Sequence, residues 1–305
     1  MIRIEESEAD VSCCASCGIA EIDDIKSMSC DGCNLVKYCS DECMEDHKSE
    51  HKEDCKKLAA ELRDELLFKQ PESTHFGDCP ICSLPIPFDG KKFVLNSCCS
   101  KFICKGCSYA NRMREIELRQ NATCPFCRER MPRTTEEAHT QNMKRIEAND
   151  PIAICKRGVE QYNKKEYICA LEYFTKAAAL GSIEAHARLA HLYQHEEGVE
   201  KDEGKRVYHL EEAAIGGHPL ARYNLGRHEL EKYRLGRHEL ENGTLERAMK
   251  HWIIAATQGY DAAIKGLMGA FKDGFLKKEV LAATLRAHKA AVDATKSPQR
   301  EAVGE

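Results

Sequence analysis

The chain has 305 residues, which is enough for two or three domains. Its 45 Lys and Arg nearly balance its 50 Asp and Glu, so the formal net charge is only −5 and no general attraction to nucleic acid or an anionic membrane is expected. No stretch reaches the ~18 consecutive apolar residues of a membrane helix, and the acidic residues 1–10 lack the features of a secretory signal. We therefore expect a soluble protein of the cytoplasm or nucleus, with membranes excluded and nucleic acid disfavoured as partners.

Cysteine is distributed very unevenly along the chain. Sixteen of the 18 cysteines lie between Cys13 and Cys127, and only Cys155 and Cys169 follow. Because cytosolic thiols stay reduced, closely spaced cysteine pairs there indicate metal sites rather than disulfides. The composition thus predicts a metal-binding half followed by a half of a different kind.

The first cysteine cluster spans residues 14–55 and offers eight candidate ligands in four pairs. These are Cys14 and Cys17, Cys30 and Cys33, Cys39 and Cys43, and His51 and Cys55. Zinc prefers four tetrahedral thiolate or imidazole ligands, so eight ligands indicate two sites. The two pairs with three intervening residues have the spacing of one face of a helix.

This pattern resembles the MYND finger, through CASC at 14–17, CDGC at 30–33, YCSDEC at 38–43 and HKEDC at 51–55. Ligand pairs interleave in that family. The resemblance implies one zinc ion on Cys14, Cys17, Cys39 and Cys43, and a second on Cys30, Cys33, His51 and Cys55. It also implies binding of short proline-containing peptides, weakened here because residues 45–48 lack the tryptophan often found there. His47 is an alternative to His51, but only His51 stands at the family's distance from Cys55.

A helical linker is predicted at residues 56–72. Leu58, Leu62 and Leu66 recur every four residues and give this segment one apolar face. Pro71 cannot continue a helix and ends it. The linker therefore separates the first cysteine cluster from a second one.

The second cysteine cluster spans residues 79–128 and again offers eight ligands. They are Cys79, Cys82, Cys98, Cys99, Cys104, Cys107, Cys124 and Cys127. By the same argument they indicate two tetrahedral zinc sites. The whole chain is then expected to bind about four zinc ions.

The order of these pairs resembles a RING finger, through CPIC at 79–82, CSKFICKGC at 99–107 and CPFCR at 124–128. Lys101 stands where a usual RING has a histidine, so the all-cysteine variant fits better. Cys98 is adjacent to Cys99 rather than two residues earlier and is the least regular ligand. The family's cross-brace implies one zinc ion on Cys79, Cys82, Cys104 and Cys107, and another on Cys98, Cys99, Cys124 and Cys127.

RING fingers are mostly ubiquitin ligases, which position a ubiquitin-loaded conjugating enzyme and use no covalent catalytic residue. The resemblance implies that Ile81 fills an apolar pocket of that enzyme and that Pro125 lines the same surface. It implies that Arg128 hydrogen-bonds across both partners, a role suited to a planar guanidinium. The alternative is that Ile81 and Pro125 are packing residues and Arg128 is a solvated charge.

A second helical linker is predicted at residues 134–149. Thr134 and Glu137 stand at capping-box spacing at its start. Pro151 then suits the first turn of the next helix. We therefore expect helices on both sides of Asn149.

Internal repeats fill residues 150–295. The set Ala177, Ala178, Gly181 and Ala185 recurs 36 residues later as Ala213, Ala214, Gly217 and Ala221, and a third copy begins at Ala255. Such a period indicates a solenoid of helix pairs, in which the glycine ends one helix so that the next can fold back. The pattern resembles Sel1-like repeats, which implies about four helix pairs and a concave surface for protein partners.

One segment interrupts this period, because RYNLGRHELE at 222–231 is followed by the near-copy KYRLGRHELE at 232–241. Ten residues are not a whole number of helical turns, so we expect a lengthened helix or a bulged loop there, and no new site. The histidines at 186, 191 and 195 lack an evident further ligand. They are interpreted as surface or packing residues.

The sequence therefore predicts a mainly α protein, in which two small cross-braced zinc modules precede an α-solenoid of helix pairs. The function it favours is protein interaction, as a RING-type ubiquitin ligase that recruits its substrate through the MYND finger and the solenoid. The alternative is a non-catalytic adaptor organised by zinc. The expected partners are a ubiquitin-conjugating enzyme, short proline-containing peptides and an unidentified substrate.

Overall fold

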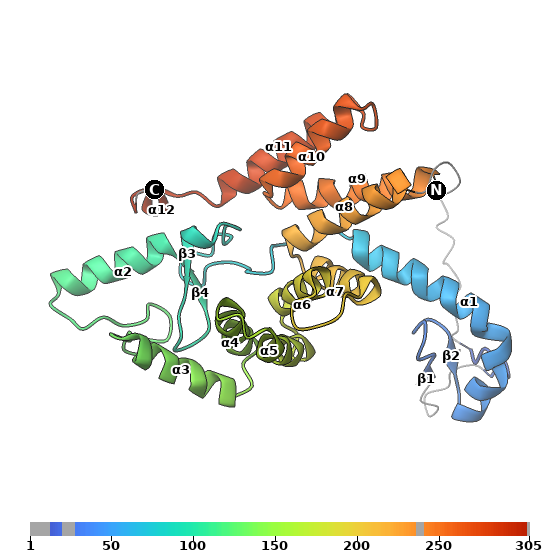
Figure 1. The fold of residues 1–305 in the computed structure, drawn as a ribbon, viewed down its shortest axis with the longest axis horizontal. Coiled ribbons are helices and arrows are strands. Elements are labelled where there is room, and N and C mark those ends of the chain that lie inside the picture. Colours follow the sequence, from blue (N-terminus) through green and yellow to red (C-terminus); the bar gives the residue numbers. More distant parts are fainter. Residues whose placement is uncertain (1–12, 20–27, 236–240, 304–305) are drawn as a thin grey trace, which may run out of the picture. The chain divides into compact units, whose positions relative to one another are not determined.

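The computed structural model of the protein describes residues 13–19, 28–235 and 241–303 (Figure 1). The chain divides into two compact units, Met1–Lys69 and Gln70–Glu305. The second cysteine cluster therefore shares one unit with the helical repeats. Within the described ranges, no helix has the length and apolar character needed to cross a membrane.

The first unit is built from a short hairpin and one long helix. Strand β1 (Met28–Ser29) pairs antiparallel with β2 (Lys37–Tyr38), and α1 (Asp41–Phe68) follows. Ser40 begins the helix, because its side-chain oxygen accepts a hydrogen bond from the amide of Cys43 at 3.2 Å. Helix α1 runs without interruption into the segment predicted as a linker, residues 56–72, and ends within it at Phe68.

The second cysteine module, residues 79–127, has a small mixed structure. A 3₁₀ turn η1 (Gly90–Lys92) leads into β3 (Phe93–Leu95), which pairs antiparallel with β4 (Phe102–Cys104), and α2 (Lys105–Glu117) follows. Its buried core contains only two aliphatic side chains beside the cysteines, Ile86 and Ile103. Phenylalanine side chains at positions 76, 93 and 102 pack around this core, Phe102 edge to face on the other two and Phe76 tilted against Phe93.

Helix α3 (Thr135–Glu147) connects this module to the repeats. Thr134 caps it as predicted, accepting a hydrogen bond from the amide of Glu137 at 3.1 Å. In a capping box the Glu137 carboxylate would accept a hydrogen bond from the amide of Thr134. Here it accepts instead from the amide of the preceding residue, Arg133, at 2.7 Å. The next helix begins at Pro151, the position expected for it.

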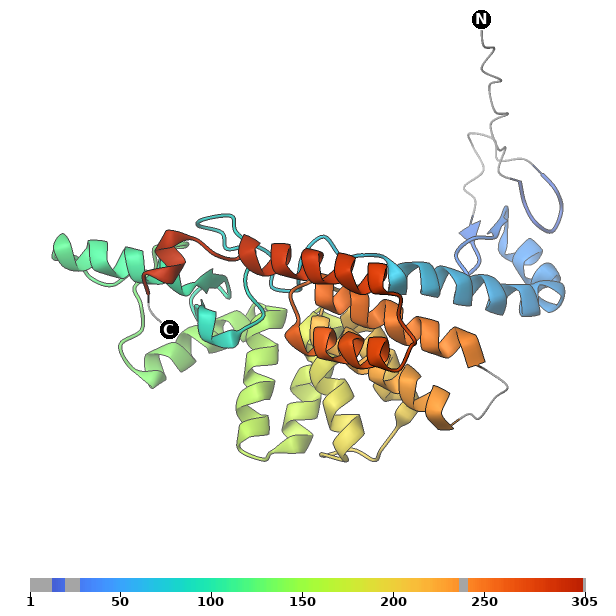
Figure 2. The same cartoon turned by 90° about the horizontal axis from the view of Figure 1, so that it is seen from above.

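Four helix pairs form the solenoid, which confirms the predicted fold class (Figure 2). Consecutive helices contact one another along the array. The helices are α4 (Pro151–Asn163), α5 (Tyr167–Ala179), α6 (Ile183–His195), α7 (Glu203–Ile215), α8 (Pro219–Leu235), α9 (Glu241–Thr257), α10 (Asp261–Lys272) and α11 (Lys278–Ala294).

The repeat glycines end helices as their spacing predicts. Gly181, Gly217 and Gly259 have backbone φ angles of 86°, 84° and 85°, the left-handed region that glycine enters without a Cβ penalty. In each copy, the residue after the glycine donates its amide to the carbonyl of an alanine five residues earlier. The alanines at these helix contacts are fully buried, which lets neighbouring helices approach closely.

The duplicated segment lengthens a helix, one of the two outcomes expected. Helix α8 has 17 residues where α4 to α7 have 13 each, and it contains the whole first copy. Residues 236–240 of the second copy lie outside the described residues. Part of the extra length is thus taken up by α8.

The C-terminal segment returns to the second cysteine module. Helix α12 (Pro298–Glu301) packs against α2, as both views show (Figures 1 and 2). A Cβ added to Gly106 would lie 2.8 Å from the carbonyl oxygen of Gln299, so this approach requires glycine at position 106. The C-terminal segment is therefore held against the second cysteine module.

We expect Gly158→Ala to destabilise the solenoid by about 1–3 kcal/mol, the usual cost of overpacking a core. An added Cβ in α4 would lie 2.6 Å from the buried ring of Phe174 in α5. Urea unfolding followed by helical circular dichroism measures the change in unfolding free energy. Gly269→Ala in α10 is the matched control, because its Cβ would contact nothing within 4 Å. Equal effects of the two substitutions would contradict the proposed packing of α4 on α5.

Candidate metal centres

The first unit brings eight ligands together in two groups of four. Cys14, Cys17, Cys39 and Cys43 form one group, and Cys30, Cys33, His51 and Cys55 form the other. Helix α1 supplies Cys43, His51 and Cys55, and the hairpin and its flanking turns supply the rest. These are the two interleaved sets that the MYND resemblance implies.

His51, and not His47, lies in the second of these groups. The Nε2 atom of His51 is 3.4 Å from the Sγ atom of Cys33, and the residue is buried. His47 lies one turn earlier on α1 and its Nδ1 atom is 3.1 Å from the hydroxyl of Tyr38. His47 therefore packs beside the site and orients Tyr38. Cys13 is exposed and belongs to neither group.

The second cysteine module holds two further groups of four cysteines. One group converges at the start of α2 and consists of Cys79, Cys82, Cys104 and Cys107. The other joins the turn between β3 and β4 to the loop after α2 and consists of Cys98, Cys99, Cys124 and Cys127. The pairs interleave again, the first with the third and the second with the fourth. Each group therefore ties together two segments that are distant in sequence.

Adjacent Cys98 and Cys99 reach the same group because they lie in a turn. In a strand, consecutive side chains point to opposite faces. Here the chain turns between β3 and β4, closed by a hydrogen bond from the amide of Ser100 to the carbonyl of Asn96 at 2.9 Å. Ser100 has a left-handed φ of 53°, which costs a non-glycine residue about 1–2 kcal/mol. The turn thus accepts backbone strain to bring both thiols to one side.

The distances between ligand atoms fit zinc and exclude disulfides. The short sulfur–sulfur contacts within the groups include 3.4 Å for Cys98 and Cys127 and 3.9 Å for Cys82 and Cys104, and all ligand atoms of a group lie within 4.8 Å of one another. A disulfide bond would be about 2.05 Å long. Four sulfur ligands at about 2.3 Å from a tetrahedral zinc ion stand about 3.8 Å apart. All 18 cysteines are free thiols, so the 15 in these groups are available to a metal.

Local donors favour the thiolate form at selected ligands. The backbone amide of Cys17 is the main cause that lowers the pKa of Cys14 to about 6. Burial of Cys82 opposes ionisation, but the backbone at Leu84 and the Arg300 guanidinium lower its pKa to about 7. Since zinc binds the deprotonated thiol, these donors reduce the cost of releasing the proton.

Arg300 is an outer-shell partner that the sequence did not reveal. Its Nη2 atom donates to the Sγ atom of Cys82 at 3.3 Å and to the carbonyl of Leu84 at 3.0 Å. Its Nη1 atom donates to the carbonyl of Pro85 at 2.8 Å. One side chain near the end of the chain therefore holds the first knuckle of the second module. No local motif marks it, because its partners lie more than 200 residues earlier.

The three residues assigned to a conjugating enzyme differ in exposure. Ile81 is 43% exposed in the turn between Cys79 and Cys82, and Arg128 is exposed directly after Cys127, the last ligand of this module. Pro125 is buried, while its neighbour Phe126 is exposed. The Lys101 ammonium lies 5.8 Å from the ring centre of Phe126, so this lysine is placed outside the metal group. Apolar surface is thus available at Ile81 and Phe126.

A fifth group of metal-ligating type was not predicted from the sequence. His75, Glu184 and His218 have ligand atoms within 4.8 Å of one another. The repeat histidines weighed from the sequence, at 186, 191 and 195, all lie on α6, whereas this group joins a loop, the start of α6 and the residue before α8. Only the tertiary fold brings these three positions together.

Comparison with known proteins supports the identification of the first cysteine cluster as a MYND-type finger. The MYND finger family model matches residues 14–55. No curated protein matches the chain. Together with the ligand geometry, the family match identifies residues 14–55 as a MYND-type zinc finger.

Solved structures similar to the chain include Sel1-repeat proteins. A Sel1 repeat protein from Oxalobacter formigenes has 22% identity and a TM-score of 0.43, covering 58% of this chain and 51% of that one. A protective antigen of uropathogenic Escherichia coli with an SLR fold has 23% identity and a TM-score of 0.38, covering 57% and 36%. An immunity protein from Pseudomonas aeruginosa has 22% identity and a TM-score of 0.39, covering 54% and 64%. The chain spans less than two thirds of each.

We expect Arg300→Gln to lower the zinc affinity of the group containing Cys82 by about 10- to 100-fold, the typical effect of losing a hydrogen-bond partner of a metal ligand. The reason is the loss of its charged hydrogen bond to the Cys82 thiolate. Zinc transfer to a chromogenic chelator, followed over time, measures this change as one faster-released ion per chain. Arg286→Gln on the exposed surface of α11 is the control and should release zinc like the wild type. Identical release from both variants would refute the role of Arg300.

Proposed function

We propose that the protein is a zinc-organised protein-interaction adaptor whose second cysteine module acts as a RING-type ubiquitin ligase. The adaptor role rests on the MYND-type finger and the helical repeats, both suited to binding other proteins. The ligase role is supported above all by one observation. The second module has two interleaved cysteine groups, and an apolar side chain, Ile81, is exposed in the knuckle of the first.

The ligase chemistry asked of this module is positional. A conjugating enzyme carries ubiquitin as a thioester, and the ligase restrains that conjugate in a reactive pose without forming a bond to it. Ile81 would enter an apolar pocket of the conjugating enzyme. The exposed Arg128 guanidinium would donate hydrogen bonds to both the enzyme and ubiquitin. Within this mechanism, the buried Pro125 supports the loop rather than forming the outermost contact.

Helix α2 offers additional surface for a protein partner. Tyr109, Met113 and Ile116 recur at helical spacing and are 47%, 38% and 52% exposed. Leu118, just after the helix, is 56% exposed. A row of exposed large apolar side chains on a small module is typical of an interaction site. This row favours protein binding by the second module whether or not it acts as a ligase.

Substrate recruitment is assigned to the other parts of the protein. The MYND-type finger would take short proline-containing peptides, and the solenoid would take a folded or extended protein. The zinc ions are proposed to number four in the cysteine groups, one for each group of four ligands. They serve as structural ions, since four protein ligands close a tetrahedral site.

A non-catalytic adaptor is the second candidate. The burial of Pro125 favours it, because a ligase of this type would use that position on its contact surface. In this case the same apolar row on α2 would bind a partner other than a conjugating enzyme. The two candidates differ in one measurable activity.

The wild-type protein is expected to accelerate discharge of ubiquitin from a charged conjugating enzyme onto free lysine. Arg128→Ala should reduce this acceleration by about 10- to 100-fold, because a hydrogen bond to a charged group is worth about 1.5–3 kcal/mol. Ile81→Ala should act similarly by weakening enzyme binding. Single-turnover assays over a panel of conjugating enzymes measure both effects.

Arg286→Ala on α11 is the matched control and should retain wild-type activity. Zinc content should be equal in all variants, which separates loss of the interaction surface from loss of the fold. Absence of acceleration by zinc-loaded wild type across the panel would reject the ligase and favour the adaptor.

A further inference from the structure

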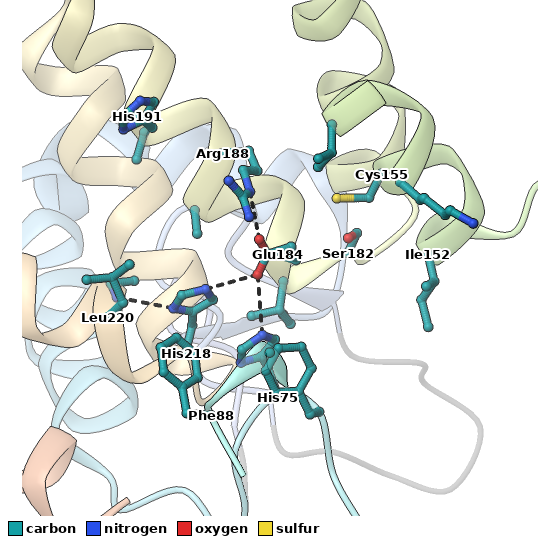
Figure 3. Close-up of a pocket in the computed structure, with 18 of the residues that line it drawn as sticks. His75, Phe88, Ile152, Cys155, Ser182, Glu184, Arg188, His191, His218 and Leu220 are labelled. Atoms are coloured by element: carbon teal, nitrogen blue, oxygen red, sulfur yellow. Dashed lines mark hydrogen bonds and ion pairs between the residues drawn. The ribbon is translucent and has the colours of Figure 1, made fainter. Parts of the chain in front are cut away.

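A cavity of about 660 Å³ lies between the second cysteine module and the solenoid (Figure 3). Its wall is largely apolar, with Phe88 from the module and Leu220 from α8 among its lining residues. The same cavity is lined by three polar residues, His75, Glu184 and His218, whose side chains point toward one another in Figure 3. Neither the MYND-type finger nor the four cysteine groups uses these residues.

The ligand atoms of this group are spaced as around a single metal ion. The Oε2 atom of Glu184 is 3.2 Å from Nε2 of His218 and 3.4 Å from Nε2 of His75. Ligands about 2.0–2.1 Å from a tetrahedral zinc ion stand about 3.3–3.4 Å apart. We propose that His75, Glu184 and His218 form a fifth metal site, which binds a divalent transition-metal ion of the zinc type through two nitrogens and one carboxylate oxygen.

His75 provides an independent reason to place a ligand here. Its side chain is only 3% exposed, yet its Nδ1 atom has no hydrogen-bond partner among the described residues, and its Nε2 atom meets Oε2 of Glu184 at 3.4 Å without good hydrogen-bond geometry. Buried polar atoms are nearly always satisfied, so a buried ring with one orphaned nitrogen and one weak contact requires an explanation. A metal ion bound at Nε2 supplies the missing partner on the side that faces Glu184.

The carboxylate is oriented for this role from its other oxygen. The Nε atom of Arg188 donates to Oε1 of Glu184 at 2.7 Å, which leaves Oε2 facing the two imidazoles. The contact lies within α6, one turn apart, so the helix itself fixes the geometry. Outer-shell partners of this kind hold ligating carboxylates in metal sites.

The loop that carries His75 is fixed to the solenoid by its backbone. The amide of His75 donates to the carbonyl of Gly217 at 3.2 Å, and Gln258 donates to that carbonyl at 3.1 Å. A Cβ on Gly217 would lie 2.8 Å from the carbonyl oxygen of Ser73. The repeat glycine that ends α7 therefore also admits the loop, and it places His75 over His218 with ring centres 4.3 Å apart. Because the two rings are stacked at an angle of only 15°, one ring must rotate when the ion binds so that both Nε2 atoms point at it.

Metal binding requires one proton to move on His218. Its Nδ1 atom accepts from the amide of Ala221 at 3.2 Å, which places the proton of the metal-free ring on Nε2, facing Glu184. The ion replaces that proton at Nε2, and Nδ1 takes up a proton, so the long contact to Ala221 is given up. One such neutral hydrogen bond is small beside the free energy of metal binding.

Nitrogen and oxygen ligands make this site different from the four cysteine groups. It contains no thiolate, and three protein ligands leave a coordination position for water or for a molecule in the cavity. The ion would also join the loop before the second module to two solenoid helices. This inference does not rest on the proposed ligase function.

The test is metal counting on the full-length, untagged protein with all cysteine groups loaded with zinc. Elemental analysis should give one more zinc ion per chain in the wild type than in His75→Phe or Glu184→Gln. Phenylalanine keeps the aromatic packing around position 75, and glutamine keeps the shape of Glu184. Titration of Co²⁺ into protein that holds zinc only at its four cysteine groups should show one equivalent bound without sulfur charge-transfer absorption, and at least about 100-fold weaker binding in both variants.

His191→Phe is the matched control, because this histidine lines the same cavity but lies outside the group. It should keep the additional ion, and all variants should keep the cysteine-bound zinc and the wild-type circular dichroism. The proposal is overturned if the wild type takes up no Co²⁺ beyond the cysteine groups, or if both His75→Phe and Glu184→Gln bind it as the wild type does. Neither result depends on ubiquitin discharge.

Discussion

Convergence of thiolates on shared metal ions is the interaction on which both cysteine modules depend. The buried cluster of the first module consists of Cys14, Cys30, Cys33 and Tyr38, so three of its four members are ligands. Its strands have two residues each, far too few to be stable alone. Modules of this size lack the core to fold unaided, and metal binding supplies the missing free energy. Everything displayed on their surfaces, Ile81 and Arg128 included, therefore requires occupied sites.

The second module also depends on the solenoid. Phe88 packs edge to face against Tyr260, with ring centres 5.5 Å apart, and Arg300 holds the first cysteine knuckle. The backbone of the preceding loop is bound to Gly217. Because these contacts come from two different repeats and from the segment that follows the solenoid, they fix the module at several points. This arrangement explains why the second module and the repeats form one compact unit, whereas the MYND-type finger is separate.

What could be predicted from the sequence was encoded at short range. Ligand pairs with two or three intervening residues showed which cysteines act together, and the repeat glycines at 181, 217 and 259 showed where helices end. What could not be predicted depended on contacts between distant segments. Arg300 follows Cys82 by 218 residues, and His75 meets Glu184 only when the loop docks on the solenoid. The exposure of individual side chains could not be predicted either, since Pro125 is buried while its neighbour Phe126 is exposed.

The charge of each metal group explains where outer-shell cations are needed. A zinc ion with four thiolates carries a net charge of −2, whereas the group with His51 carries −1. Burial makes such a charge costly unless donors surround it. At the group containing Cys82, Arg300 supplies both a positive charge and a hydrogen bond, and the thiolates in turn raise the pKa of Arg300 against its burial. The C-terminal segment and this metal site therefore stabilise each other: loss of zinc would remove the negative charge pattern that holds α12, and loss of α12 would leave the tetrathiolate less compensated.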